Sequence, residues 1–294
     1  MVPWCRWMAV GWPAKPTMTQ IGRPIHARFL AIDEGRQQLS LVDTDRSEAL
    51  WILDLKDHPL ARSMQRLDAD RALVGFDGGF FEVELATGRV VSTVNRWKNV
   101  TSVARQDGVT LVTGTDLDGK PGVVVLSIDA QGSVVATARR DGDYVRLMQP
   151  AGPGRYLLCT NDHILETTGD LQAFRSFRVE GFLHAWKAQR LADGATLVAA
   201  GYGAFMARFA ADGTLAQTFG RAADLPAEIA PFFYATFQVR ADGTLLVVNW
   251  QGHGPDNGHK GRQLLEFTAD GRFTGSWSSP GWLSSLQGLL LLEG

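Results

Sequence analysis

Short apolar segments separated by turn sequences run along most of the chain, and this pattern predicts β-strands. Residues 184–221 show it clearly, because apolar and polar side chains alternate and a turn falls roughly every six to ten residues. No longer window carries a clear helical period, and only residues 222–231 are compatible with a single helical turn. Within residues 184–221, the predicted strands are 184–191, 196–201, 204–210 and 214–220.

The turn tripeptide Ala-Asp-Gly recurs four times before apolar runs, and its glycine accepts the positive φ that a tight turn requires. In two copies a glutamine stands five residues before the glycine, as Gln189 does before Gly194. The same place in the predicted first strand of each repeat gives six positions, which we call anchors. Successive anchors are 38, 46, 40, 49 and 49 residues apart. A period of about 40–50 residues with four strands is typical of a β-propeller blade. The anchors are Gln65, Val103, Gln149, Gln189, Gln238 and Gln287.

The two ends of the chain complement one another. Segment 283–292 supplies only a first strand, whereas the N-terminal unit lacks a first strand and supplies three others, at 28–33, 37–43 and 49–55. Joining them in one sheet removes the open edges that would favour aggregation. We therefore predict an all-β fold, a six-bladed β-propeller in which one blade is closed by both termini.

Two turn sequences resemble those of the quinoprotein-like and arylsulfotransferase-type propeller repeats. They are residues 84–91 (ELATGRVV) and 267–277 (FTADGRFTGSW), which are similar to the turn between the third and fourth strands of such a repeat. Trp277 stands where those repeats often carry a tryptophan. The resemblance implies propeller blades over most of the chain. It implies no catalytic residue and no quinone cofactor, because quinone enzymes of this type have more than six blades.

Composition and charge narrow the possible partners and compartments. The chain has 294 residues, 45% of them apolar, and a net charge of −2, which disfavours a nucleic-acid surface. The leucine run at the C-terminus is too short to span a membrane. Residues 1–25 contain four prolines and predict an irregular or disordered extension, followed by a single propeller domain over 26–294. The apolar stretch 7–12 is too short for a signal peptide, so we expect a cytoplasmic protein, with the periplasm as the alternative if translation starts elsewhere.

The candidate ligand site lies on the face where the links between blades meet the loops that join second and third strands. That face surrounds the mouth of the central channel, and a pocket there is the default site in a β-architecture. Its predicted residues combine aromatic walls with cationic and imidazole groups, which suits sugars and other ring-bearing polar molecules. The alternative is that the aromatic rings wedge between blades and the charges are solvated. The residues are His58, Arg62, Trp97, Tyr144, Arg146, His184, Trp186, Phe233, Trp250 and Trp282.

The loop between the second and third strands of blade six is nine residues longer than its counterpart in blade five, since its Ala-Asp-Gly turns lie 28 rather than 19 residues apart. The insertion, 251–260, contains His253, Asp256 and His259. Imidazole and carboxylate groups can bind zinc or another divalent cation. Histidine can also transfer protons near neutral pH. Three interpretations stay open: ligand contact with acid–base chemistry by His184, His253 and His259; metal binding; and a solvated loop. No metal or cofactor is assigned.

Two functional hypotheses follow. The first is a pocket at the channel mouth that binds a small, carbohydrate-like molecule, with catalysis on that molecule left open. The second is a non-catalytic propeller that binds a protein or peptide on the same face. A deep pocket lined by His58, Arg146, His184 and His253 favours the first hypothesis, and a flat or plugged face favours the second.

Overall fold

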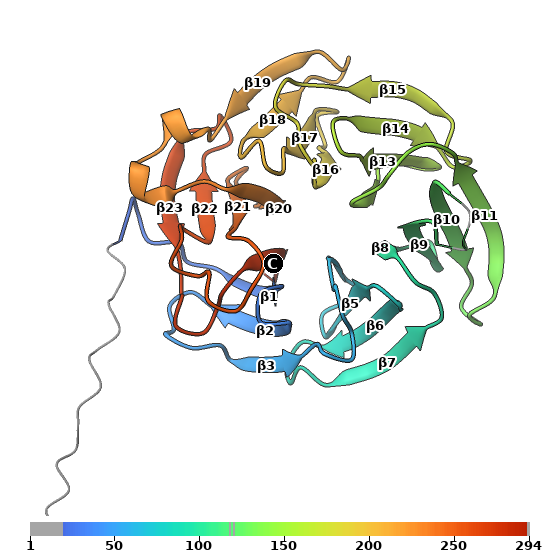
Figure 1. Ribbon diagram of the computed structural model, residues 1–294, viewed down its shortest axis with the longest axis horizontal. Coiled ribbons are helices and arrows are strands. Elements are labelled where there is room, and N and C mark those ends of the chain that lie inside the picture. Colours follow the sequence, from blue (N-terminus) through green and yellow to red (C-terminus); the bar gives the residue numbers. More distant parts are fainter. Residues whose placement is uncertain (1–19, 118, 120, 293–294) are drawn as a thin grey trace, which may run out of the picture.

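Six four-stranded antiparallel sheets surround a central channel as the blades of a propeller (Figure 1). The computed structural model describes residues 20–117, 119 and 121–292. The predicted all-β, six-bladed architecture is confirmed, and each of the six sequence anchors lies on the innermost strand of its blade.

The strands of each blade are given from the channel outwards. Blade 1 contains β24 (Leu286–Leu291), β1 (Arg28–Asp33), β2 (Gln38–Asp43) and β3 (Trp51–Asp54). Blade 2 contains β4 (Ser63–Arg66), β5 (Arg71–Phe76), β6 (Gly79–Glu84) and β7 (Val90–Asn95). Blade 3 contains β8 (Val100–Gln106), β9 (Val109–Thr115), β10 (Val123–Ile128) and β11 (Val134–Arg140). Blade 4 contains β12 (Met148–Pro150), β13 (Arg155–Cys159), β14 (Ile164–Thr168) and β15 (Ala173–Phe177). Blade 5 contains β16 (Lys187–Arg190), β17 (Thr196–Ala199), β18 (Met206–Phe209) and β19 (Leu215–Phe219). Blade 6 contains β20 (Phe233–Val239), β21 (Leu245–Trp250), β22 (Leu264–Phe267) and β23 (Phe273–Trp277).

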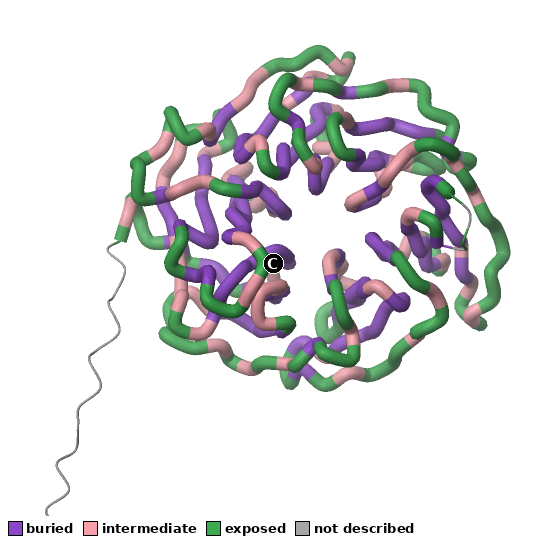
Figure 2. The backbone as a smooth tube through the Cα atoms, in the orientation of Figure 1, coloured by how far each residue is buried: buried purple, intermediate pink, exposed green. Residues whose placement is uncertain are grey.

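Burial falls from the middle of each blade to its outer edge (Figure 2). In blade 2, five of the six residues of β5 are buried, whereas none of the six in β7 is. The middle strands therefore read as nearly continuous apolar runs, because both of their faces pack against neighbouring blades. Between blades 1 and 2, for example, Leu30 and Ile32 belong to the same apolar cluster as Val74 and Phe81.

Side chains of the innermost strands bridge neighbouring blades around the channel. Gln65 of blade 2 bonds both backbone groups of Arg105 in blade 3, accepting from its N–H at 2.6 Å and donating to its carbonyl at 2.8 Å. Each such bond satisfies a backbone group that no adjacent strand can reach. Three more of these bonds run from Ser102 Oγ to Met148 O (3.1 Å), from Lys187 Nζ to Phe237 O (2.7 Å) and from Thr236 Oγ to Gln287 O (2.9 Å).

The ring closes where the first and last strands meet. Strand β24 pairs antiparallel with β1, with Phe29 opposite Leu291 and Ala31 opposite Leu289, as the sequence predicts. The buried Asp33 carboxylate reinforces this pairing by accepting the backbone N–H groups of Ser284 (2.7 Å) and Ser285 (2.8 Å). Burial raises the pKa of Asp33, and these backbone hydrogen bonds oppose the rise.

The segment before β1 is irregular where the structure describes it, and it lies along the outer strand of blade 6. Arg23 N–H donates to Thr274 O at 2.8 Å, and the Arg23 guanidinium contacts the buried Glu266 carboxylate at 2.6 Å. Residues 1–19, most of the predicted extension, lie outside the described residues. In the predicted helical stretch 222–231 the chain forms two 3₁₀ turns, η1 (Ala222–Asp224) and η2 (Ala227–Ile229). Across the described residues, no helix has the length and apolar character that a membrane crossing requires.

We predict that Asp33→Ala destabilises the protein by about 3–5 kcal/mol, because it leaves two buried N–H groups without an acceptor at the closure. Asp33→Asn keeps one acceptor oxygen and should cost less, about 1–3 kcal/mol. The measurement is urea unfolding followed by circular dichroism. The matched control is Asp54→Ala, whose exposed carboxylate bonds Lys56 and should change the free energy of unfolding by less than about 0.5 kcal/mol. Equal losses in Asp33→Ala and Asp54→Ala would show that Asp33 does not hold the closure.

Candidate functional site

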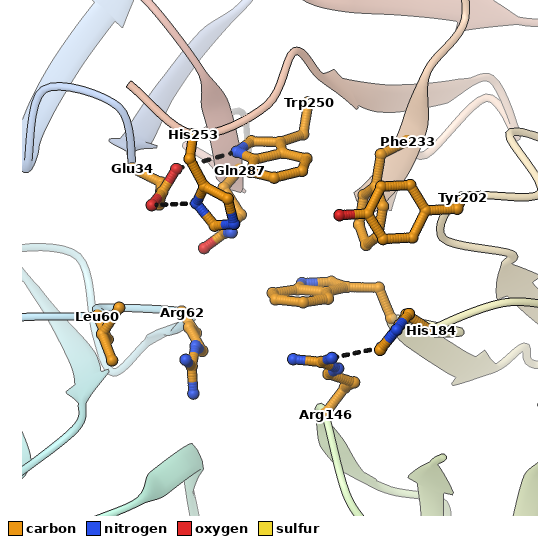
Figure 3. A pocket seen from close by; sticks show the side chains of 11 residues that line it. Glu34, Leu60, Arg62, Arg146, His184, Tyr202, Phe233, Trp250, His253 and Gln287 are labelled. Atoms are coloured by element: carbon orange, nitrogen blue, oxygen red, sulfur yellow. Dashed lines mark hydrogen bonds and ion pairs between the residues drawn. The ribbon is translucent and has the colours of Figure 1, made fainter. Parts of the chain in front are cut away.

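A cavity of about 120 Å³ lies at the channel mouth, on the face formed by the inter-blade links and the loops between second and third strands (Figure 3). At roughly 10–15 Å³ for each water-sized body, it has room for a molecule of about one sugar ring. Blades 1, 2, 4, 5 and 6 all contribute side chains, so the site exists only in the closed ring. Seven of the predicted residues line it: Arg62, Arg146, His184, Trp186, Phe233, Trp250 and His253.

Four other predicted residues do not line this cavity. His58 stacks on Phe81 with ring centroids 4.4 Å apart, and it lines a smaller neighbouring cavity of about 100 Å³. Tyr144 lies under the Arg146 guanidinium, 4.6 Å from the ring centroid. Trp97 packs against the apolar core between blades 2 and 3, and Trp282 donates from Nε1 to Ser47 O at 2.9 Å. These rings support the blades, as the alternative interpretation of the aromatic residues expects.

The inserted loop 251–260 folds over the closure and is tied to it. Ser284 Oγ donates to Gly254 O at 2.6 Å and accepts the Asn257 N–H at 3.0 Å. Gly35 permits this approach, since a Cβ at that position would collide with Gly254 O. The loop therefore directs His253 to the channel mouth.

The three polar residues of the insertion do not converge. Asp256 and His259 are exposed and lie outside the cavity that His253 lines. The physical reason is the anchoring at Gly254 and Asn257, which turns positions 256 and 259 towards solvent. Among the described residues, no group of three or more His, Cys, Asp or Glu side chains is placed to hold a metal ion.

Glu34 and His253 form a carboxylate–imidazole pair on one side of the cavity (Figure 3). Glu34 Oε1 lies 2.8 Å from His253 Nδ1, and Glu34 Oε2 accepts from Trp250 Nε1 at 3.3 Å. A carboxylate at Nδ1 fixes the tautomer that carries its proton there, which leaves Nε2 as a free acceptor. Such an imidazole is suited to take a proton from a bound molecule, and the carboxylate would stabilise the resulting imidazolium.

His184 has the opposite partner. Its Nδ1 accepts a hydrogen bond from the Arg146 guanidinium, so that the other nitrogen, Nε2, carries the ring proton. Burial lowers the pKa of His184, and the Arg146 charge lowers it further. His184 is therefore neutral at pH 7 and can donate a hydrogen bond. One cavity thus holds a histidine paired with an anion and a histidine paired with a cation.

The His184 backbone is strained, with φ at +54°, a region that few residues other than glycine adopt. Flanking backbone bonds impose this geometry, since Leu183 N–H donates to Ala200 O at 3.3 Å and Leu183 O accepts from Tyr202 N–H at 2.9 Å. Gly201 makes the approach possible, because a Cβ there would collide with His184 O. Leu60, across the cavity, also has a positive φ, +55°. Strained residues at a cavity are a frequent mark of functional sites.

Aromatic side chains form one wall of the cavity. The Phe233 ring lies edge-on to those of Trp186 (5.4 Å), Tyr202 (4.7 Å) and Trp250 (5.3 Å). Edge-to-face packing of this kind holds each ring in a fixed orientation. The wall offers apolar faces on which a flat ring can lie.

Four lining residues were not identified from the sequence. Glu34 and Tyr202 lie in the short loops between second and third strands of blades 1 and 5, Leu60 lies in a link, and Gln287 is on β24. Comparing all six such loops would have identified Glu34 and Tyr202, because the loops share one face. Gln287 is one of the six repeat anchors, which places it on an innermost strand, whereas Leu60 has no comparable signal in the sequence.

No protein-family model matches this chain, and no curated protein does. Solved structures match it over most of its length. A protein of unknown function from Bacteroides caccae is 18% identical, with a TM-score of 0.75 over 92% of this chain and all of the other. A functionally unknown protein from Desulfotomaculum acetoxidans DSM 771 is 15% identical, with a TM-score of 0.57 over 90% and 98% of the two chains. A catalytically inactive virginiamycin B lyase from Staphylococcus aureus, solved with quinupristin, is 9% identical, with a TM-score of 0.60 over 93% and 95%. At these identities the matches establish the propeller fold alone.

We predict that the free energy of unfolding falls as the pH drops below about 6.5. Burial lowers the pKa of both His58 and His184 in the folded protein, so between the lowered values and 6.5 the unfolded chain binds protons that the folded chain does not. Stability therefore rises with pH across that window. Urea unfolding between pH 5 and 7.5 measures it, and the double substitution His58→Gln with His184→Gln should flatten the profile. An unchanged slope in the double variant would contradict the assignment.

Proposed function

We propose that this protein binds a small, ring-bearing polar molecule, carbohydrate-like in size, in the channel-mouth cavity, and performs acid–base chemistry on it. His253, paired with Glu34, is the base. His184, kept neutral beside Arg146, is the hydrogen-bond donor. The observation that carries the proposal is the presence of these two differently paired imidazoles in one aromatic-walled cavity. Opposite environments around two titratable groups are how one site assigns a base and a donor.

Unsatisfied polar atoms support a ligand in this cavity. Arg146 Nε, Trp186 Nε1 and Gln287 Oε1 are buried and have no hydrogen-bond partner in the protein. A buried polar group without a partner costs free energy, and native structures contain few of them. Three on the residues of one small cavity are explained if hydroxyl and oxo groups of a bound molecule complete the network.

The concave shape of the site favours a small molecule over the alternative, a protein or peptide partner. Three of the four residues that discriminate the hypotheses, Arg146, His184 and His253, line the cavity, and His58 lies beside it. The Staphylococcus aureus structure is that of a virginiamycin B lyase with quinupristin, so a propeller of this fold can be a lyase. That likeness is compatible with the proposal and identifies no substrate.

We predict that at least one member of a panel of single-ring molecules raises the melting temperature. The panel contains D-glucose, D-galactose, N-acetyl-D-glucosamine, D-glucuronate and D-glucose 6-phosphate. At a hundred times its dissociation constant, a ligand stabilises the folded state by about 2.7 kcal/mol, which is a shift of roughly 5 °C or more. Tyr202→Ala should weaken binding about tenfold, because it removes a half-exposed ring from the wall.

The matched control is Phe174→Ala, which removes an exposed ring from the outer strand of blade 4 and should leave binding unchanged. Equal effects of the two variants on affinity would place the binding site elsewhere. If no panel member raises the melting temperature and members of a peptide library do, the protein-binding alternative is favoured.

Acid–base chemistry predicts exchange of a ligand C–H proton with solvent. In the panel, D-glucuronate carries a ring C–H next to a carboxylate, at C5, and if it binds, proton NMR in D₂O should show loss of that signal. His253→Gln should slow the exchange at least about a hundredfold, the usual contribution of a general base, with affinity changed only a few-fold. Binding without exchange in the wild type would reduce the function to recognition alone.

A further inference from the structure

Two arginines, Arg62 and Arg146, enter the cavity from the links of blades 2 and 4. Each is fixed by its backbone just before the innermost strand, since Arg62 N–H donates to Gly75 O (3.0 Å) and Arg146 N–H donates to Cys159 O (2.7 Å). Figure 3 shows both guanidinium groups on the side of the cavity opposite Glu34 and His253. The arginines and the carboxylate–imidazole pair therefore face each other across the space a ligand would fill.

Neither arginine has a carboxylate partner among the described residues. The Arg62 side chain makes no hydrogen bond or ion pair with any of them, and the Arg146 side chain bonds His184 while its Nε stays buried without a partner. The carboxylate lining the cavity, Glu34, is already committed to His253 and Trp250. Two positive charges therefore face one negative charge in this cavity.

Three other partly buried arginines are paired with glutamates. Each lies on or next to an innermost strand and contacts a buried or nearly buried glutamate on a third strand. These pairs are Arg105 with Glu82 (2.8 Å), Arg190 with Glu166 (2.7 Å) and Arg240 with Glu266 (2.9 Å). The two cavity arginines thus depart from the pattern that the same fold uses elsewhere.

An unpaired guanidinium in a cavity lowers stability, because it loses water without gaining a counter-charge. Burial lowers the pKa of Arg62 and the Arg146 charge adds to this, while Tyr144 and the carboxylates of Asp77 and Glu34 oppose it. Arginine nevertheless stays charged in proteins, so the molecule cannot relieve the cost by losing a proton. An anion supplied from outside relieves both the desolvation and the repulsion between the two arginines.

The arrangement also fixes the shape of that anion. The Arg146 guanidinium stacks over Tyr144 at 4.6 Å and over Trp186 at 5.6 Å, which holds its planar fork of donors in place. A fork of this kind bonds two oxygens of a carboxylate or phosphate at once. Next to it, the aromatic wall of Phe233 and Tyr202 accepts the ring to which such a group is attached.

We propose that Arg62 and Arg146 form the oxyanion-binding end of the cavity, and that the ligand is a single ring carrying a carboxylate or phosphate. This inference rests on the proposed function for the ring and adds the charge. The oxyanion sits on the arginines, the ring lies on the aromatic wall, and the far side of the ring faces His253 and Glu34.

The experiment compares sugars that share one ring. Isothermal titration with D-glucose, D-glucuronate, D-glucose 6-phosphate and inorganic phosphate separates the ring from the charge and the carboxylate from the phosphate. Glucuronate or glucose 6-phosphate should bind wild type at least about tenfold more tightly than glucose, and more weakly as salt is raised. Arg62→Gln and Arg146→Gln should each remove most of that preference, because they lower the affinity for the charged sugars far more than the affinity for glucose.

The matched control is Arg178→Gln, which removes an exposed arginine paired with Asp162 and should leave the preference intact. A second readout needs no ligand. Arg62→Gln should keep or raise the melting temperature in low salt, because it removes an unpaired charge, whereas Arg190→Gln should lower it, because it removes the closer of the two arginines that contact the buried Glu166. A loss of stability in Arg62→Gln as large as that in Arg190→Gln would overturn the proposal.

The outcomes distinguish this inference from the proposed function. Equal affinity for glucose and both charged sugars would refute the oxyanion site and leave the ring-binding function standing. Stabilisation of wild type but not Arg62→Gln by inorganic phosphate, with no sugar bound, would support the oxyanion site and refute the sugar ring. If neither phosphate nor any sugar binds wild type, both proposals are wrong.

Discussion

The pairing of β1 with β24 is the contact on which both the ring and the cavity depend. Asp33 accepts two N–H groups of the segment that leads into β24, and the next residue, Glu34, donates its own N–H to Ser285 O at 3.0 Å. The same turn therefore closes the propeller and places the carboxylate that pairs with His253. Because Ser284 also anchors the inserted loop, the closure brings Glu34 and His253 together from positions more than two hundred residues apart.

A propeller can bring distant residues together at one cavity because its blades are rigid and the loops on its face are free to vary. The inner strands are linked through side-chain bonds such as those of Gln65 and Thr236, so each blade has a fixed position relative to the next. Strain can then be held at the mouth, as at His184, since two neighbouring segments impose its φ of +54°. Without that support the histidine would relax to a common backbone conformation and turn away from Arg146.

The blades could be predicted from the sequence because their signals are local: strand periodicity, the Ala-Asp-Gly turns and the anchor spacing. Closure was predictable because the terminal leucine run has no other partner. The face that carries the cavity followed from connectivity, and with it Arg62, Arg146 and His184. What the sequence could not supply was side-chain direction in the long loop. All three polar side chains of the loop are exposed, but only His253 lines the cavity, and this placement depends on hydrogen bonds to Ser284, thirty residues away in the sequence.

The charge arrangement at the mouth is best understood as a cost that the fold does not remove. Three other partly buried arginines have glutamates on third strands, so the chain has a ready way to neutralise such a group. Arg62 and Arg146 lie on links, and the carboxylate that lines their cavity, Glu34, is bonded to His253. A site that kept two free cations, a fixed aromatic wall and a base on the opposite side would lose stability without a ligand and recover it with one. The two unpaired guanidinium groups would then both lower the stability of the ligand-free protein and bind the anion.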